Sequence, residues 1–313
     1  MVNRAGGASS FFSAPSDTLD PHLFDDEEQL RPEVAYYILG TLDEFMADHG
    51  FHDPGSWLHV WLAGSGITYQ WAANRGNGDL DVLFGIHHGV FATANPDYRE
   101  WSEDDLAAEF NEKLKADLWP LTANHDFGGQ KYDVTFFMNP GTGTDITKIH
   151  PYAAYDVVSN QWTVRPPDVA ADPRSAYPSD WARKAQADKG YTDSIIRRYN
   201  QFSDALNSSQ PGSPGWHNAG AGVQLAAAQA HALFSEIHTG RRDAFGDQGH
   251  GYGDWNNYRW QAAKEAGVIS GLHDIVEAQE RGREAEETQL YGAPLKGADE
   301  LIRRAAMQYK DRQ

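Results

Sequence analysis

The segment WLHVWLAGSGITYQWAANRGNGDLDVLFGI, residues 57–86, decides how the rest of the chain is interpreted. It begins with an apolar run, Trp57–Ala63, that has the length and composition of a buried strand. A Gly64-Ser65-Gly66 turn and a mixed segment typical of a short helix follow. The segment ends in a second apolar run, which contains Asp79 and Asp81. It therefore predicts two core strands joined by a glycine-rich turn.

Asp79 and Asp81 are the chemically distinctive residues of this segment. Successive side chains of a strand point to opposite faces, so the two carboxylates project together while the apolar residues between and after them face a core. Two adjacent carboxylates repel each other, and burying them without partners is costly. A divalent cation is the simplest compensation. The pattern of strand, Gly-Ser turn and paired aspartates predicts a site for phosphate and magnesium.

Composition narrows the classes of function. The chain has 313 residues, a formal net charge of −19 and 40% hydrophobic residues, which is typical of a globular protein large enough for two domains. Such an acidic surface disfavours an extended nucleic-acid footprint but permits nucleotides whose phosphates are bridged by metal. Without cysteine there are no disulfides, zinc-thiolate sites or cysteine nucleophiles. With no leader-like or membrane-spanning apolar run, we expect a cytoplasmic protein.

The pattern of elements predicts an α+β fold. Residues 1–20 are small and polar and are expected to form a flexible tail. Residues 21–170 combine strand and helix patterns, and we expect a small mixed β-sheet flanked by helices. A proline-rich linker near residue 170 precedes residues 171–313, which are expected to form an all-helical domain. Its expected helices cover residues 179–190, 192–206, 217–239, 255–279 and 299–309.

A third acidic residue lies on a later predicted strand. The run Lys131–Met138 alternates, with Asp133 on the face opposite its apolar residues. An isolated aspartate inside such a strand requires an explanation, and a shared metal supplies one. Asp126 and Asp145 are the alternatives if the strand lies elsewhere.

The Gly64-Ser65 turn, the Asp79-x-Asp81 pair and a third acid on a later strand resemble the polymerase-beta-like nucleotidyltransferase superfamily, over about residues 57–138. The interval between the turn and the pair is long for that superfamily, which predicts an extended loop at residues 75–78 over the site. Two further stretches, LFDDEEQLRPEV (residues 23–34) and PYAAYDVVSNQWTVRPP (residues 151–167), resemble bacteriophage-encoded nucleotidyltransferases.

The resemblance implies roles for individual residues. Asp79, Asp81 and Asp133 would hold two Mg²⁺ ions, with Mn²⁺ as a substitute, and these ions would activate an acceptor hydroxyl and neutralise the triphosphate. Gly64 and Ser65 would bind the triphosphate of an NTP such as ATP. Because a helical domain usually closes over the nucleotide in this superfamily, Arg183 and Lys184 are the leading candidates for additional phosphate contacts. Other basic candidates are Arg75, Lys131, Lys148 and Arg165.

The sequence does not identify the acceptor substrate of the reaction. The glycine-rich segment 240–254 is consistent with an acceptor-binding lid or with an interhelix loop. The aromatic residues that follow, Trp255, Tyr258 and Trp260, are consistent with the core of a helix or with a stacking surface for a base. The expected function is Mg²⁺-dependent transfer of an NMP from an NTP to an acceptor hydroxyl or phosphate. A small molecule, including a cationic one such as an aminoglycoside, a second nucleotide or a protein fits the acidic surface better than a long nucleic acid. Oligonucleotide or cyclic-nucleotide synthesis remains open.

The alternative function is a non-catalytic nucleotide-binding sensor or interaction module on the same fold. The complete set of three acids argues against it, since a site that has lost catalysis is expected to lose some of its ligands.

Overall fold

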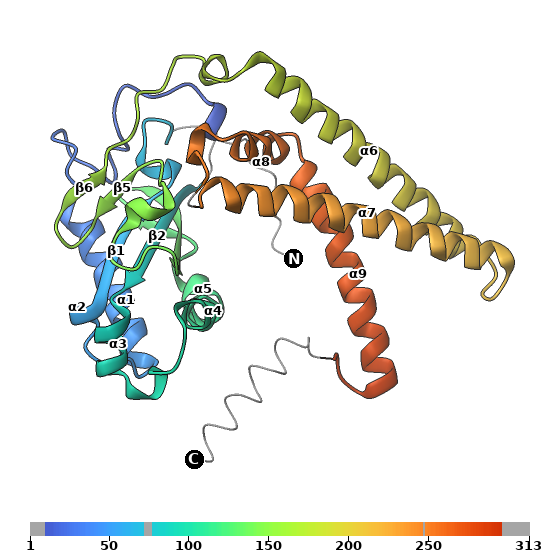
Figure 1. The fold of residues 1–313 in the computed structure, drawn as a ribbon, viewed down its shortest axis with the longest axis horizontal. Coiled ribbons are helices and arrows are strands. Elements are labelled where there is room, and N and C mark those ends of the chain that lie inside the picture. The colour runs from blue at the N-terminus through green and yellow to red at the C-terminus, as the bar shows by residue number, and fades with distance from the viewer. Residues whose placement is uncertain (1–9, 72–76, 247, 296–313) are drawn as a thin grey trace. The chain divides into compact units, whose positions relative to one another are not determined.

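The computed structural model describes residues 10–71, 77–246 and 248–295 (Figure 1). Its centre is a mixed six-stranded sheet with the strand order β3-β4-β2-β1-β5-β6. The parallel pair is β2 with β4, and the other neighbouring strands are antiparallel. The strands are β1 (Leu58–Ala63), β2 (Gly78–Ile86), β3 (His125–Phe127), β4 (Gln130–Met138), β5 (Ala154–Asp156) and β6 (Gln161–Val164).

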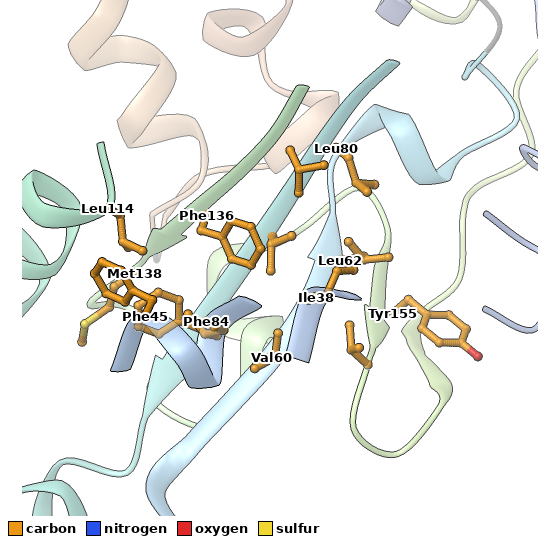
Figure 2. Close-up of a cluster of buried hydrophobic side chains, with 14 of the residues drawn as sticks. Ile38, Phe45, Val60, Leu62, Leu80, Phe84, Leu114, Phe136, Met138 and Tyr155 are labelled. Carbon is orange, nitrogen blue, oxygen red and sulfur yellow. The ribbon is translucent and has the colours of Figure 1, made fainter. Parts of the chain in front are cut away.

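One face of the sheet carries the main core (Figure 2). Alternate residues of the central strands, including Leu80 and Val82 of β2 and Val134 of β4, are completely buried there. Figure 2 shows Leu80 and Phe84 of β2 in the same cluster as Ile38 and Phe45 of α1 (Pro32–Asp48). The alternation expected from the sequence is therefore confirmed for β2 and β4, and it leaves the odd-numbered aspartates on the opposite face.

Short helices complete this layer, namely α2 (Pro54–Trp57), α3 (His88–Ala94), α4 (Glu103–Lys113) and α5 (Trp119–Thr122). Ser102 caps α4 by accepting a hydrogen bond from the Asp105 backbone N–H at 3.1 Å. A π-helical turn, Leu114–Leu118, connects α4 to α5, where Pro120 occupies the first turn and so needs no N–H partner.

The C-terminal region is helical, and it contains α6 (Ser179–Ser208), α7 (Pro214–Ala244), α8 (Trp255–Glu265) and α9 (Val268–Tyr291). The two helices expected at 179–190 and 192–206 are one helix. The single helix expected at 255–279 is divided at Gly267, whose φ of 72° is left-handed. The helix expected at 299–309 lies outside the described residues.

The chain divides into two compact units. The first contains residues 1–186 and 237–266, and the second contains residues 187–236 and 267–313. This division differs from the boundary expected near residue 170, because the end of α7, the following loop and α8 belong with the sheet. No described helix is both long enough and apolar enough to span a membrane.

The start of the described chain also differs from the flexible tail expected at residues 1–20. Phe11, Leu19 and Asp20 are all buried in the first unit. The carboxylate of Asp20 accepts a hydrogen bond from the Tyr132 hydroxyl at 2.6 Å. Residues 1–9 lie outside the described part.

Candidate functional site

The face of the sheet opposite the main core brings the three predicted aspartates together. In the parallel pairing of β2 with β4, Asp79 lies directly beside Asp133. Asp81 is flanked by Ala63 of β1 and Thr135 of β4. Since these two neighbours are small, they leave room around the Asp81 carboxylate. Neighbouring strands are about 4.8 Å apart, so the three side chains are within reach of one another.

The other end of this face is closed by apolar side chains. The next row of the sheet consists of Trp61, Leu83 and Phe137. Together with Ile146 and Ala154, the buried members of this row form a second, smaller apolar cluster. The carboxylates therefore lie on this face next to an apolar cluster. Asp79 is exposed, whereas Asp81 and Asp133 are half-buried.

The Gly64-Ser65 turn packs directly on the aspartate pair. β1 ends at Ala63, beside Asp81, so the turn begins over that carboxylate. Gly64 has a φ of 84°, and a Cβ atom at this position would lie 2.6 Å from Oδ2 of Asp81. A Cβ atom at Gly66 would overlap the backbone carbonyl of Asp79. Both glycines are required by this close approach, and the turn and the pair form one local structure.

The electrostatics of Asp81 reflect this crowding. Burial, together with the negative charges of Asp79 and Asp133, raises the pKa of the Asp81 carboxyl from its usual 3.8 to about 7. The positive charges of Arg241 and Lys264 oppose this rise in pKa. The Asp81 carboxyl group is therefore harder to ionise than an ordinary aspartate, and a nearby cation would favour its charged form.

Arg241 and Lys264 are functional candidates that the sequence analysis missed. Arg241 lies near the end of α7, where its guanidinium packs 4.9 Å over the Trp260 ring, and Lys264 lies at the end of α8. Burial lowers the pKa of Arg241, while Tyr252 and Asp81 raise it. These residues are more than 150 positions from Asp81 in the sequence, so no local pattern connects them to the site.

The described basic residues that the sequence predicts as phosphate contacts form ion pairs elsewhere or are exposed. The Lys184 ammonium lies 2.8 Å from the Asp180 carboxylate, one turn earlier in α6, and packs over Trp255. Arg183 is exposed on the same helix. Arg165 pairs with Glu28 at 2.8 Å. Lys131 and Lys148 are exposed, and Arg75, with the first half of the loop expected at 75–78, lies outside the described residues.

The alternative acids are explained by local structure. Asp126 accepts a hydrogen bond from the Gly129 backbone N–H at 2.8 Å within the β3–β4 turn. Asp145 caps a short 3₁₀ turn by accepting from the N–H and hydroxyl of Thr147. Asp133 instead faces the Asp79 side of the sheet, and its Oδ1 accepts a hydrogen bond from the Trp119 indole at 2.9 Å.

The segment 240–254 does not form one loop. Residues up to Ala244 belong to α7, and a short 3₁₀ turn, Gly251–Gly253, precedes α8. Of the aromatic residues beyond it, Tyr258 is buried, whereas Trp255 and Trp260 are half-buried. This segment brings Tyr252, with Arg241, to the neighbourhood of Asp81.

The donor set suits a hard cation such as Mg²⁺, which prefers carboxylate oxygens. Within the ranges that the structure describes, no three or more His, Cys, Asp or Glu side chains are closed around a common point as a metal-binding group. The three aspartates nevertheless share one face, where burial and the negative charges of Asp79 and Asp133 raise the pKa of Asp81. The residues present therefore fit a divalent cation in their chemistry.

Comparisons with known proteins give no family for this chain. No protein-family model matches it. Neither a curated protein nor a solved structure matches it.

Proposed function

We propose that this protein is a Mg²⁺-dependent nucleotidyltransferase of the polymerase-beta-like type, which transfers an NMP from an NTP to an acceptor hydroxyl or phosphate. The observation that carries the proposal is the single surface formed by Asp79, Asp81 and Asp133 beneath the Gly64-Ser65 turn. Carboxylates and a close-approach glycine turn are the parts that positioning and charge neutralisation of a triphosphate need.

In the proposed reaction the acceptor oxygen forms a bond to the α-phosphorus of the NTP, and the bond between the α-phosphorus and the bridging oxygen to the β-phosphate breaks. Pyrophosphate leaves with that oxygen and its electron pair, and the acceptor proton passes to solvent or to a carboxylate. Asp79, Asp81 and Asp133 would hold Mg²⁺, which would supply positive charge for the triphosphate and for the attacking oxygen.

The residues of the chain have distinct tasks in this proposal. The aspartates orient the metal-bound nucleotide, and Gly64 lets the backbone approach its phosphates without a side chain in between. Arg241 and Lys264, which already act on the charge of Asp81, add positive charge to the site. They replace Arg183 and Lys184 as the leading phosphate contacts.

The acceptor is proposed to be a small molecule, a second nucleotide or a protein side chain, because the net charge of −19 disfavours a long nucleic acid. A cytoplasmic location belongs to the same proposal.

A direct test is to incubate the protein and Mg²⁺ with each α-labelled NTP and a cell extract, and to follow the label. The proposal predicts transfer of the label to one fraction, with release of pyrophosphate, and no transfer by Asp79→Asn. A protein that binds Mg²⁺-NTP but transfers no label to any fraction would be the sensor. A protein that neither binds nor transfers would contradict both functions.

A further inference from the structure

An N-terminal segment, Phe11–Thr18, runs beside the chain that leaves the Gly64-Ser65 turn. The backbone N–H of Ser16 donates to the Tyr69 carbonyl at 2.6 Å. The Trp71 indole donates to the Thr18 carbonyl at 2.9 Å. Between these two contacts lies Gln70, whose side chain makes the connection to the rest of the site.

Gln70 is 1% exposed and uses both ends of its amide. Its Nε2 donates to the carbonyls of Phe11 at 2.9 Å and Ser13 at 2.8 Å. Its Oε1 accepts from the Tyr152 hydroxyl at 3.1 Å. One buried side chain thus joins the N-terminal segment to the loop that precedes β5, and each partner would be left without this hydrogen bond if the amide were removed.

Tyr152 links Gln70 to Tyr252. Its ring stacks on Tyr252 with centroids 4.0 Å apart and planes 20° apart. The same two chain segments meet again where a Cβ atom at Gly251 would lie 3.2 Å from the His150 carbonyl. The Phe11 ring also packs against Tyr252, at 5.8 Å. Tyr252 therefore contacts both Tyr152 and the N-terminal segment.

Tyr252 interacts electrostatically with both Asp81 and Arg241. Burial raises the pKa of its hydroxyl to about 12, so the group is neutral under physiological conditions. The ring and hydroxyl of Tyr252 help to define how Arg241 and Asp81 face each other. In a medium of low dielectric constant, a small displacement of either charge changes the electrostatic interaction between them strongly.

We propose that the N-terminal segment is an integral part of the candidate site, and that Gln70 and Tyr152 are positioning residues that hold Tyr252 beside Asp81 and Arg241. Without them Tyr252 loses its fixed orientation, and Arg241 is no longer held where it offsets the carboxylates. The effect on nucleotide binding rests on the proposed function, whereas the positioning of Tyr252 does not.

The test compares Gln70→Ala and Tyr152→Phe with a matched control, Trp71→Phe. Tyr152→Phe keeps the stacked ring and removes only the hydroxyl that binds Gln70. Trp71→Phe removes a hydrogen bond to the same N-terminal segment, at Thr18, and leaves both partners of the Gln70–Tyr152 hydrogen bond unchanged. The first measurement is hydrogen exchange of backbone amides in the full chain. Faster exchange at residues 150–153 and 248–256 is expected in the first two variants and not in the control.

The second measurement is calorimetric titration with Mg²⁺ and a non-hydrolysable ATP analogue. Gln70→Ala and Tyr152→Phe are each expected to weaken binding about ten-fold, the effect of one buried hydrogen bond, and the double variant about as much as one of them, since both break one connection.

Changes in exchange confined to residues 11–16 and 68–71 would overturn the positioning role, as would additive effects on binding. If the analogue fails to bind the unmodified protein, the proposed function fails, and the exchange measurement alone decides the positioning of Tyr252.

Discussion

At the scale of single residues, Asp81 is the most informative group of the site. It lies between two small neighbours, Ala63 and Thr135, beneath Gly64 and beside Asp79. Its identity as a candidate could be predicted from the alternation of β2. The physical state of its carboxyl group could not, because the pKa depends on Arg241, Lys264 and Asp133, which reach it only through the tertiary fold.

The raised pKa of Asp81 makes a prediction about stability without metal. Because the folded-state pKa of about 7 lies above the usual 3.8, the unfolded chain loses this proton first. The contribution of Asp81 to the free energy of unfolding therefore falls as the pH rises from about 4 to about 7 and stays low above that. Asp81→Asn should stabilise the protein at pH 8 by about 1–2 kcal/mol and have little effect at pH 5.

Urea unfolding in EDTA at the two pH values measures this difference. Asp43→Asn on α1 is the control, since Asp43 is exposed and should show no such dependence on pH. A variant of Asp81 that destabilises the metal-free protein equally at both pH values would show that the carboxylate is structural.

Gly64 provides a second prediction at this scale, with Gly129 as its control. Both residues have positive φ, 84° and 91°, but a Cβ atom at Gly129 would meet nothing within 4 Å. Gly129→Ala therefore measures backbone strain alone, whereas Gly64→Ala adds the clash with Asp81. We expect Gly64→Ala to lower the free energy of unfolding by about 1–2 kcal/mol more than Gly129→Ala. Equal losses would mean that the turn does not press on the carboxylate.

At the scale of elements, local patterns predicted β1 from its apolar run, and β2 and β4 from their alternation. The helix breaks were harder. Gly190 lies within α6, whereas Gly267 adopts a left-handed φ and separates α8 from α9. The residue type permits both outcomes, and packing decides between them. The parallel pairing of β2 with β4, which places Asp79 beside Asp133, is likewise a tertiary property.

The N-terminal cap of α4 provides a prediction about the stability of this helix, which leads through the π-helical turn to Trp119. Ser102 Oγ accepts from the Asp105 N–H and donates to the Asp105 carboxylate at 2.7 Å. Ser102→Ala should lower the free energy of unfolding by about 1 kcal/mol, and Ser102→Asp should retain most of the stability. Circular dichroism during urea unfolding measures both. A neutral Ser102→Ala change would mean that the cap does not contribute.

At the scale of the whole molecule, the site is assembled from segments that are distant in sequence. The α+β architecture with a helical C-terminal region could be predicted from the order of patterns. The inclusion of residues 10–20 and 237–266 in the unit that contains the sheet could not, since Phe11, Tyr252 and Arg241 have no local signature that relates them to Asp81. The predicted aspartates supply the negative charge of the site. Residues 10–20 and 237–266 supply its aromatic side chains and its positive charge.

The central claim is that the three aspartates form one site for a metal-bound nucleotide. Calorimetric titration of the full chain with a non-hydrolysable ATP analogue tests it most directly, with Mg²⁺ and with EDTA. Unmodified protein and Asp126→Asn, which changes an acid of the β3–β4 turn, should bind only in the presence of Mg²⁺. Asp79→Asn and Asp133→Asn should each weaken binding by about ten-fold or more. Binding that is equally tight in EDTA, or in both of these variants, would contradict the claim.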